Sequence, residues 1–312
     1  MQLIAIVILG TILGFTYGTY TDGFIFSTNI CLFAGLTLIM PSLFDFKFKD
    51  VKLVWEHKKV LLKGLMVNYL LLPSLAVAIG FATGDFGIMS GLFLLSVLSG
   101  GGMVMHWINR SGADNSFGFL LLFINLIAIS LSLMMLHGFA AYTSGYFGVT
   151  YDAEISISRF TKEVVTLLIV IPLIVSRVVL YIKPLHTLIV KYRKVISNLS
   201  LFVILFYLFG LQNSQLLVDV WDFEPELFAI SFGAVFVFYL LIFLLSMFIY
   251  NLDNPQEKAA FWHSVTRYIT LALVITTFSV NTFGVSMLLP IMFAYIVQIP
   301  WAIYISKKII TT

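Results

Sequence analysis

Ten long apolar stretches follow one another along the chain, separated by short segments that carry charges, prolines and turn residues. A bilayer core about 30 Å thick takes roughly 20 apolar residues per helix, and each stretch is close to that length. We therefore predict an all-α polytopic membrane protein with about ten transmembrane helices. The predicted spans are 2–19, 24–44, 60–80, 86–109, 117–137, 160–182, 195–214, 227–250, 259–280 and 284–306.

Positive charges are distributed unevenly among the connections between these spans. With the N-terminus in the cytoplasm, only Arg159 and Lys162 of the 18 basic residues fall in outer connections, and Arg267 lies inside a span. Short cytoplasmic loops collect Lys and Arg. The pattern predicts a multi-pass protein of the plasma (inner) membrane with both termini in the cytoplasm, and it makes the basic segment 183–194 a cytoplasmic loop.

The composition excludes most soluble classes of protein. Hydrophobic residues make up 60% of the chain and charged residues 11%, against about 45–50% and a quarter in soluble domains. The net charge of +3 is too small for a nucleic-acid partner. The single cysteine, the missing zinc spacings and the missing catalytic motifs predict no enzyme, no cofactor and no metal site.

The expected partners are therefore a small-molecule substrate and the lipid bilayer, with a second copy of the chain as a further candidate. The stretch 45–63 alternates aromatic and basic residues. This alternation predicts an interfacial helix that lies on anionic lipid.

Ten spans suggest two halves of five helices, 1–145 and 146–312. An odd number of helices per half makes a duplicated unit insert upside down, so the halves would be inverted repeats. In each half the fourth span, 86–109 or 259–280, contains a polar or glycine-rich interruption. We expect these two segments to form the site.

The first interrupted span contains three consecutive glycines at membrane depth. Each glycine weakens a helix by about 1 kcal/mol relative to alanine, and unwound backbone inside a membrane is tolerated only where it faces protein or a wet cavity. The alternative is that the glycines only allow close helix packing. The residues of this segment that we expect to line the site are Ser99, Gly100, Gly101, Gly102, His106, Asn109 and Arg110.

The second interrupted span carries His263, Thr266 and Arg267 in its first half. An arginine inside a membrane costs at least about 2.5–3.5 kcal/mol on insertion scales, so it should face a cavity or a partner. The alternative for Arg267 is that it lies near enough to the helix end to snorkel to the surface. The alternative for His263 is a structural hydrogen bond.

Three further polar residues have two interpretations each. Asp114 follows the fourth span and either caps the next helix or acts as a gate or proton carrier. Asn125 lies in an apolar helix and must satisfy its polar groups in lipid, either at the crossing or by bonding to a neighbouring helix. The same two interpretations apply to Gln298.

Several of these segments resemble helices two to five and ten of the bile acid:sodium symporter superfamily, most closely its arsenite-permease branch. The resemblance implies ten helices in two inverted repeats, with helices four and nine unwound where they cross and a core domain that moves against a panel domain. The residues that carry it are 35–38, 68–73, Gly100, Gly101, Met103, Val104, Trp107, Asp114, Asn125 and 297–300.

The departures from the family pattern bear on coupling. Asn68 matches a sodium-ligand position of the symporters, but their Ser-Asn pair is Val104 and Met105 here, and their helix-nine glutamate and glutamine fall at His263 and Arg267. Sodium needs oxygen ligands. The arsenite carriers' cysteine would sit at Gly100, and their helix-ten glutamate is Gln298.

We therefore expect a secondary active transporter of a small solute, an organic anion, that does not use sodium. Arg267 supplies the positive charge that favours an anion, and it would take the electrostatic place of the cation. Uniport and proton coupling through His263 or Asp114 are both open. The alternatives are an arsenite or metalloid efflux permease and a sodium-coupled symporter.

Overall fold

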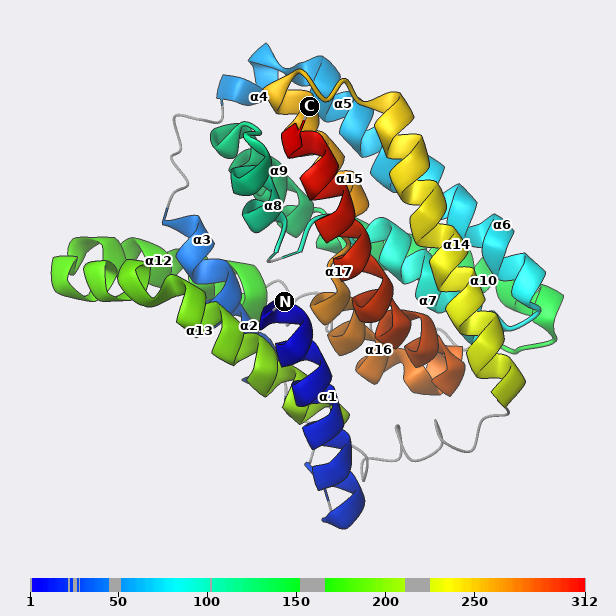
Figure 1. The fold of residues 1–312 in the computed structure, drawn as a ribbon. Helices are drawn as coiled ribbons and strands as arrows, with labels where there is room; N and C mark the ends of the chain where they lie inside the picture. Colours follow the sequence, from blue (N-terminus) through cyan, green and yellow to red (C-terminus); the bar gives the residue numbers. More distant parts are fainter. Residues whose placement is uncertain are drawn as a thin grey trace. The chain divides into compact units, whose positions relative to one another are not determined.

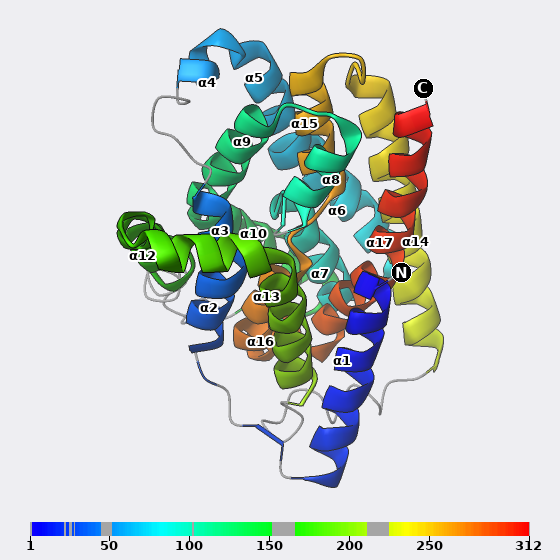
Figure 2. The same ribbon diagram turned by 60° about the vertical axis from the view of Figure 1, so that its left-hand side comes forward.

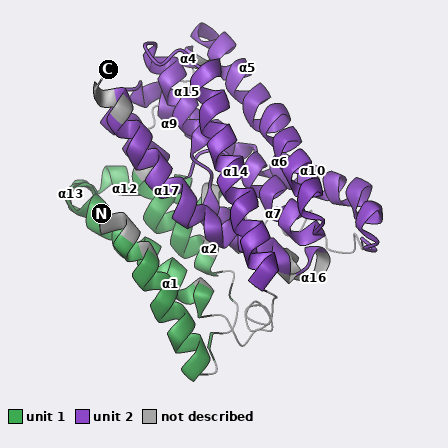
Figure 3. Ribbon diagram, turned by 45° about the vertical axis from the view of Figure 1, so that its right-hand side comes forward, with its two compact units in different colours: residues 1–46, 158–222 green, residues 47–157, 223–312 purple. Residues whose placement is uncertain are grey.

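The computed structural model describes residues 2–21, 23–24, 27, 29–44, 52–101, 103–151, 166–210 and 225–311. These residues are almost entirely helical (Figure 1), and they include one isolated β-bridge, between Ser99 and Arg267, but no strand. The chain divides into two compact units (Figure 3), the first made of residues 1–46 and 158–222 and the second of residues 47–157 and 223–312.

The first unit is built around two long helices that lie side by side, α1 and α13 (Figure 2). Gly10 and Gly14 let them approach closely, because a Cβ on Gly14 would lie 2.6 Å from the carbonyl oxygen of Phe206. The elements of this unit are α1 (Gln2–Tyr20), α2 (Asn29–Ala34), η1 (Gly35–Ile39), α3 (Met40–Leu43), η5 (Thr166–Val170), α12 (Ile171–Tyr181) and α13 (Lys183–Phe209).

The segment 183–194 is not the loop that its charges suggested. It forms the first turns of α13, which begins at Lys183 and meets α12 at a bend of 117°. Pro184 lies in the first turn, where a proline costs a helix no hydrogen bond. Lys, Leu and Arg are good helix formers, so a basic segment next to a membrane span continues the helix instead of interrupting it.

The second unit contains the predicted helix breaks. Its elements are α4 (Lys52–Glu56), α5 (Lys58–Met66), η3 (Val67–Leu71), α6 (Leu72–Thr83), α7 (Phe86–Val97), α8 (Val104–Ser111), α9 (Asn115–Ile127), α10 (Ile129–Thr143), η4 (Ser144–Phe147), α14 (Pro225–Ile249), α15 (Pro255–Val265), α16 (Ile269–Phe283), η7 (Val285–Met287) and α17 (Leu288–Thr311).

The stretch 45–63 does not form one interfacial helix in its described part. Residues 45–51 lie outside the described residues, α4 is five residues long, and α5 already belongs to the long apolar helix 58–83. Lys58 and Lys59 therefore stand at the start of a candidate span.

Within the part of the chain that the structure describes, three helices are long and apolar enough to cross a membrane, and two bent pairs bring the total to as many as five. The three helices are Lys58–Thr83, Pro225–Ile249 and Leu288–Lys307. Helix is also present within each of the ten predicted ranges. The chain is thus a multi-pass membrane protein, and the crossing of all ten segments stays a prediction.

Both predicted interruptions are present in the second unit (Figure 1). Helix α7 ends at Val97 and α8 begins at Val104, and α15 ends at Val265 before α16 begins at Ile269. Each broken helix starts at a side-chain cap. Asp85 accepts a hydrogen bond from the N–H of Ile88 at 2.7 Å, and Asn254 accepts one from Gln256 at 3.0 Å.

Candidate functional site at the two helix breaks

The two helix breaks pair with each other through their backbones. Ser99 and Arg267 form an antiparallel bridge. Unwound backbone at membrane depth must find its hydrogen bonds within the protein, and here each break supplies them to the other. The bonds run from the N–H of Gly100 to the carbonyl of Thr266 at 2.9 Å and from the N–H of Tyr268 to the carbonyl of Leu98 at 3.0 Å.

Gly100 is required at this contact for two reasons. Its φ of +62° lies in the left-handed region, which costs other residues about 1–2 kcal/mol. A Cβ at this position would also lie 2.3 Å from Nδ1 of His263. Gly101 is close as well, with a Cβ at 3.2 Å from the Cα of Tyr268. These glycines thus permit the two breaks to meet. The segment is unwound, and its glycines also allow close packing, so both interpretations of the three glycines hold. Gly102 lies outside the described residues.

The guanidinium of Arg267 lies at the centre of the crossing and is only 1% exposed. Its Nε donates to the carbonyl of Leu95 at 2.9 Å, and Nη2 donates to the carbonyl of Ser96 at 2.6 Å. Its Nη1 donates to Oδ1 of Asn68 and to the carbonyl of Ser264, both at 2.7 Å. The side chain therefore points into the protein and does not snorkel to the membrane surface.

Three of these four acceptors are carbonyls at helix C-termini. Leu95 and Ser96 lie in the last turn of α7, and Ser264 lies in the last turn of α15. The last carbonyls of a helix carry a partial negative charge and attract cations. No carboxylate among the described residues bonds to Arg267, and the one ion pair found among them joins Lys63 and Glu257. The guanidinium is thus hydrogen-bonded without being neutralised.

Gln298 of α17 holds the second break from the other side. Its Oε1 accepts from the backbone N–H of Arg267 at 2.6 Å and from the hydroxyl of Tyr239 at 2.9 Å. All three residues are buried. Gln298 thus contacts the crossing and also bonds to a neighbouring helix, α14, so both interpretations hold.

Asn125 and His263 form a second polar cluster, around Ser99. The hydroxyl of Ser99 donates to the carbonyl of His263 at 2.8 Å, and Nδ2 of Asn125 donates to Oγ of Ser99 at 3.1 Å. The Nδ1 and Nε2 atoms of His263 lie 3.1 Å from Asn125 and 2.9 Å from the carbonyl of Gly118. This arrangement fits a neutral imidazole that accepts at Nδ1 and donates at Nε2.

Four other predicted residues do not join this network in the described contacts. His106, Asn109 and Arg110 are exposed on one face of α8. Asp114 caps α9, where Oδ1 accepts from the N–H of Phe117 at 2.9 Å, so the capping interpretation is confirmed. Thr266 belongs to the crossing through its backbone, while its hydroxyl bonds to the carbonyl of Trp262 within α15.

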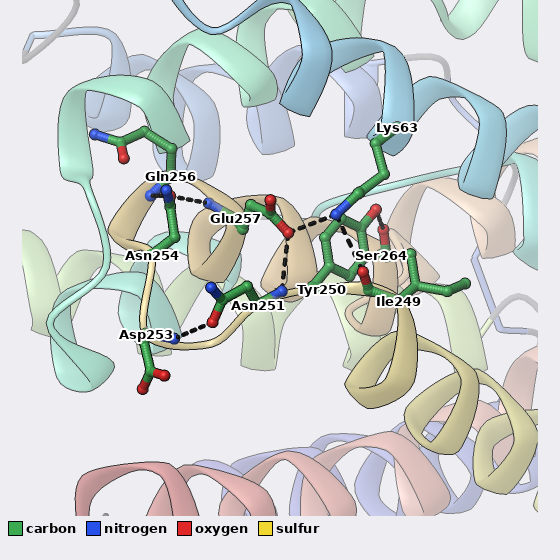
Figure 4. Close-up of polar contacts among 9 residues, drawn as sticks. All are labelled: Lys63, Ile249, Tyr250, Asn251, Asp253, Asn254, Gln256, Glu257 and Ser264. Atoms are coloured by element: carbon green, nitrogen blue, oxygen red, sulfur yellow. Dashed lines mark hydrogen bonds and ion pairs between the residues drawn. The ribbon is translucent and has the colours of Figure 1, made fainter.

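A polar connection leads from Arg267 to Lys63 in the last turn of α5, and the site prediction included only Asn68 of its members beyond Arg267. Oγ of Ser264 lies 3.4 Å from Nδ2 of Asn68 and 2.8 Å from the hydroxyl of Tyr250. Next to Tyr250, Nζ of Lys63 donates to Glu257 at 2.6 Å and to the carbonyl of Ile249 at 3.1 Å (Figure 4). A cluster of Ser and Thr beside Arg267 was the available signal for Ser264.

Residues 32–218 match the model of the sodium bile acid symporter family. The chain belongs to this family. A comparison with curated proteins found no match. Members of the sodium bile acid symporter family are membrane transporters, so the protein is a membrane transporter that sits in the lipid bilayer and binds a small-molecule substrate.

For a member of the sodium bile acid symporter family, the contact between Asn68 and Arg267 bears on whether sodium can bind. Asn68 stands where the resemblance places a sodium ligand, and here its Oδ1 accepts from a guanidinium. The oxygens that converge at this point are carbonyl and amide oxygens, the type that binds hard cations. A protein cation holds all four of them.

Proposed function

We propose that the protein is a secondary active transporter, a permease, that moves a small organic anion across the plasma membrane without sodium as the coupling ion. The observation that carries this proposal is the contact of the Arg267 guanidinium with the ends of both broken helices. Four acceptor oxygens bind it at 2.6–2.9 Å.

Sodium is disfavoured as the coupling ion because the oxygens that would bind it already bind Arg267. In transporters with broken helices, unwound carbonyls and the C-terminal ends of half-helices coordinate the coupling cation. Here the ends of α7 and α15 point at a covalently attached cation that cannot leave. The guanidinium carries one positive charge at all working pH values. It would therefore do permanently what a bound sodium ion does in each transport cycle.

An anionic substrate is favoured by the positive charge that remains at the crossing. Arg267 uses four N–H groups on neutral acceptors, so it would act on a substrate through its field and not by direct contact. Helices α8 and α16 begin directly after the two breaks, so their N-termini face the crossing region. A helix N-terminus carries about half a positive charge. Among the described residues, no carboxylate is bonded to the crossing to offset these charges.

The alternatives have less support at the same positions. A metalloid permease needs a soft thiolate ligand, and the position of the branch cysteine is Gly100, where His263 leaves no room for a Cβ. Proton transfer through His263 would need a ring nitrogen that is not engaged, while both have partners. Asp114 is occupied as a cap.

We also propose the architecture of two inverted five-helix repeats, residues 1–145 and 146–312, with helices four and nine crossing. The order of elements in the second unit supports it. In both halves a long helix is followed by a capped helix, a break, a second helix and a glycine with positive φ, Gly112 or Gly284. Each compact unit also combines chain from both halves. The cytoplasmic termini and the homodimer stay predictions.

A thermal stability screen on the purified protein tests the function. In wild type, we expect no stabilisation by sodium relative to potassium or choline, and stabilisation by a small carboxylate but not by arsenite. In Arg267→Gln, the freed oxygens should allow a response to sodium, and the response to carboxylate should disappear.

Each outcome has a definite meaning. Sodium-specific stabilisation of the wild type would overturn the coupling proposal. An equal carboxylate response in both proteins, or a response to cations alone, would overturn the anion proposal. Arg110→Gln, which removes an exposed arginine of α8, is the control for a general loss of positive charge and should keep the carboxylate response.

A further inference from the structure

An apolar groove of about 560 Å³ runs along the outer face of the helix 58–83 in the second unit. It follows the face of the helix that carries the exposed side chains of Leu62, Met66, Leu70 and Leu71. The residues that line it are Lys59, Leu62, Lys63, Met66, Val67, Leu70, Leu71, Ser74 and Ile249. One end is basic, and the rest is apolar except for Ser74.

The shape of the groove follows from an irregular helix. Val67–Leu71 is a π-helical turn, and Pro73 follows in the first turn of α6. Such turns displace the side chains around them. From Lys59 to Ser74 the helix rises by about 22 Å. One leaflet of the hydrocarbon core is about 15 Å deep, so the groove is long enough for an acyl chain with its headgroup.

The two lysines at the basic end of the groove are not equivalent. Lys59 is exposed at the start of the candidate span, beside the exposed Lys58. Lys63, one turn further in, already bonds to Glu257 and to the carbonyl of Ile249 (Figure 4). Lys59 therefore supplies the net positive charge where a headgroup would lie.

We propose that this groove binds an anionic phospholipid, with its phosphate at Lys59 and one acyl chain along Leu62, Met66 and Leu70. A soluble anion would not need the long apolar wall. A zwitterionic lipid carries no net negative charge and gains less from the lysine than an anionic lipid does. A lysine near the membrane surface is worth about 1 kcal/mol toward an anionic lipid, which corresponds to about a fivefold preference.

The groove and the Arg267 contact share one turn of the helix. Val67 lines the groove, and the next residue of the π-helical turn, Asn68, accepts from Nη1 of Arg267. A lipid in the groove would pack against the turn that positions this acceptor. We therefore expect the bound lipid to raise the thermal stability of the whole second unit.

Native mass spectrometry of the purified full chain tests the site, with phosphatidylglycerol and phosphatidylcholine offered in equal amounts. We expect the wild type to retain more phosphatidylglycerol. Lys59→Gln should lower the ratio of the two retained lipids about fivefold. Leu70→Ser, in the acyl part of the groove, should lower retention of both lipids and leave their ratio unchanged. Lys183→Gln, an exposed lysine at the start of α13, is the matched control.

An unchanged lipid ratio in Lys59→Gln overturns the proposal. So does competition by glycerol phosphate, because that result would mean a site for a free anion. A dimer that persists without lipid and dissociates in Leu70→Ser would mean that a second copy of the chain covers the groove. Normal thermal unfolding of both variants in lipid-free detergent shows that they fold.

Discussion

Two basic side chains of the second unit, Arg267 and Lys63, are held in opposite ways. Lys63 is 35% exposed and forms an ion pair with Glu257 at 2.6 Å. Arg267 is 1% exposed and bonds to neutral oxygens. The more deeply buried cation is thus the one without a carboxylate.

The difference follows from where each cation finds its acceptors. A buried carboxylate would itself cost several kcal/mol to remove from water, whereas the carbonyls at the ends of α7 and α15 are buried and unpaired in any case. A planar guanidinium with five N–H groups can reach several of them at once. An ammonium group at the surface has no such set of carbonyls and gains from a carboxylate. The ends of the broken helices therefore form a site in which uncharged oxygens bind the fixed positive charge of an arginine.

The largest expected effect comes from removing the buried guanidinium. Arg267→Gln leaves up to four buried oxygens without their donor, at about 1–3 kcal/mol each, so we expect a loss of at least about 3 kcal/mol. The measurement is thermal unfolding of the purified protein in detergent. Arg267→Ala should regain part of this stability in low concentrations of guanidinium ion.

The control for this substitution is Arg110→Gln, at an exposed position on α8, which should change stability by less than about 0.5 kcal/mol. Equal losses in the two arginine variants would remove the distinction between a buried fixed cation and a surface charge. Arg267→Lys should lie between them, because it keeps the charge but lacks the fork of donors.

A smaller effect is expected at the glycine that allows the breaks to meet. Gly100→Ala combines positive φ with a contact to His263. Gly112→Ala has positive φ and open space, and Gly138→Ala in α10 has open space without positive φ. We expect a loss of about 1–2 kcal/mol at Gly112, a larger loss at Gly100 and a gain of up to about 1 kcal/mol at Gly138.

The order of the three glycine variants is measured by thermal unfolding. If Gly100→Ala costs no more than Gly112→Ala, then His263 moves aside without cost and the crossing is not tightly packed. Transport or ligand response should also fall only in Gly100→Ala.

The smallest effect is expected at the surface pair. Partial burial raises the pKa of Glu257, but hydrogen bonds from Lys63 and from the backbone N–H of Asn251 outweigh this and hold the pKa below its usual value. Because the folded pKa is lowered, the stability from this pair is present above the usual glutamate pKa and is lost as pH falls through the folded value. Such pairs contribute about 0–1 kcal/mol.

Glu257→Gln should therefore unfold at a slightly lower temperature than wild type at neutral pH, and the gap should close as the solution is acidified. Added salt should also narrow it. A gap that does not depend on pH or salt would mean that Glu257 acts through packing and not through its charge.

The sequence predicted the breaks and several residues around them for physical reasons. Consecutive glycines and an intramembrane arginine are costly in a helix or in lipid, so their positions were informative. The acceptors at Leu95 and Ser96 could not be found in this way, because backbone carbonyls are contributed by any residue type. His106, Asn109 and Arg110 recur at spacings of one helical turn, a pattern that also describes the exposed face they occupy.

The pairing of the two breaks has a consequence for how the chain is made. Ser99 and the carbonyl of His263 that it binds are 164 residues apart, which is about 8–33 s of synthesis at 5–20 residues per second. During that interval the second break has not yet been synthesised. The N–H of Gly100 and the carbonyl of Leu98, which bond to Thr266 and Tyr268 in the folded protein, therefore lack these partners. Interruption of synthesis between the two breaks should therefore leave a product that is open to degradation, so the first half depends on the second for its passage through the membrane.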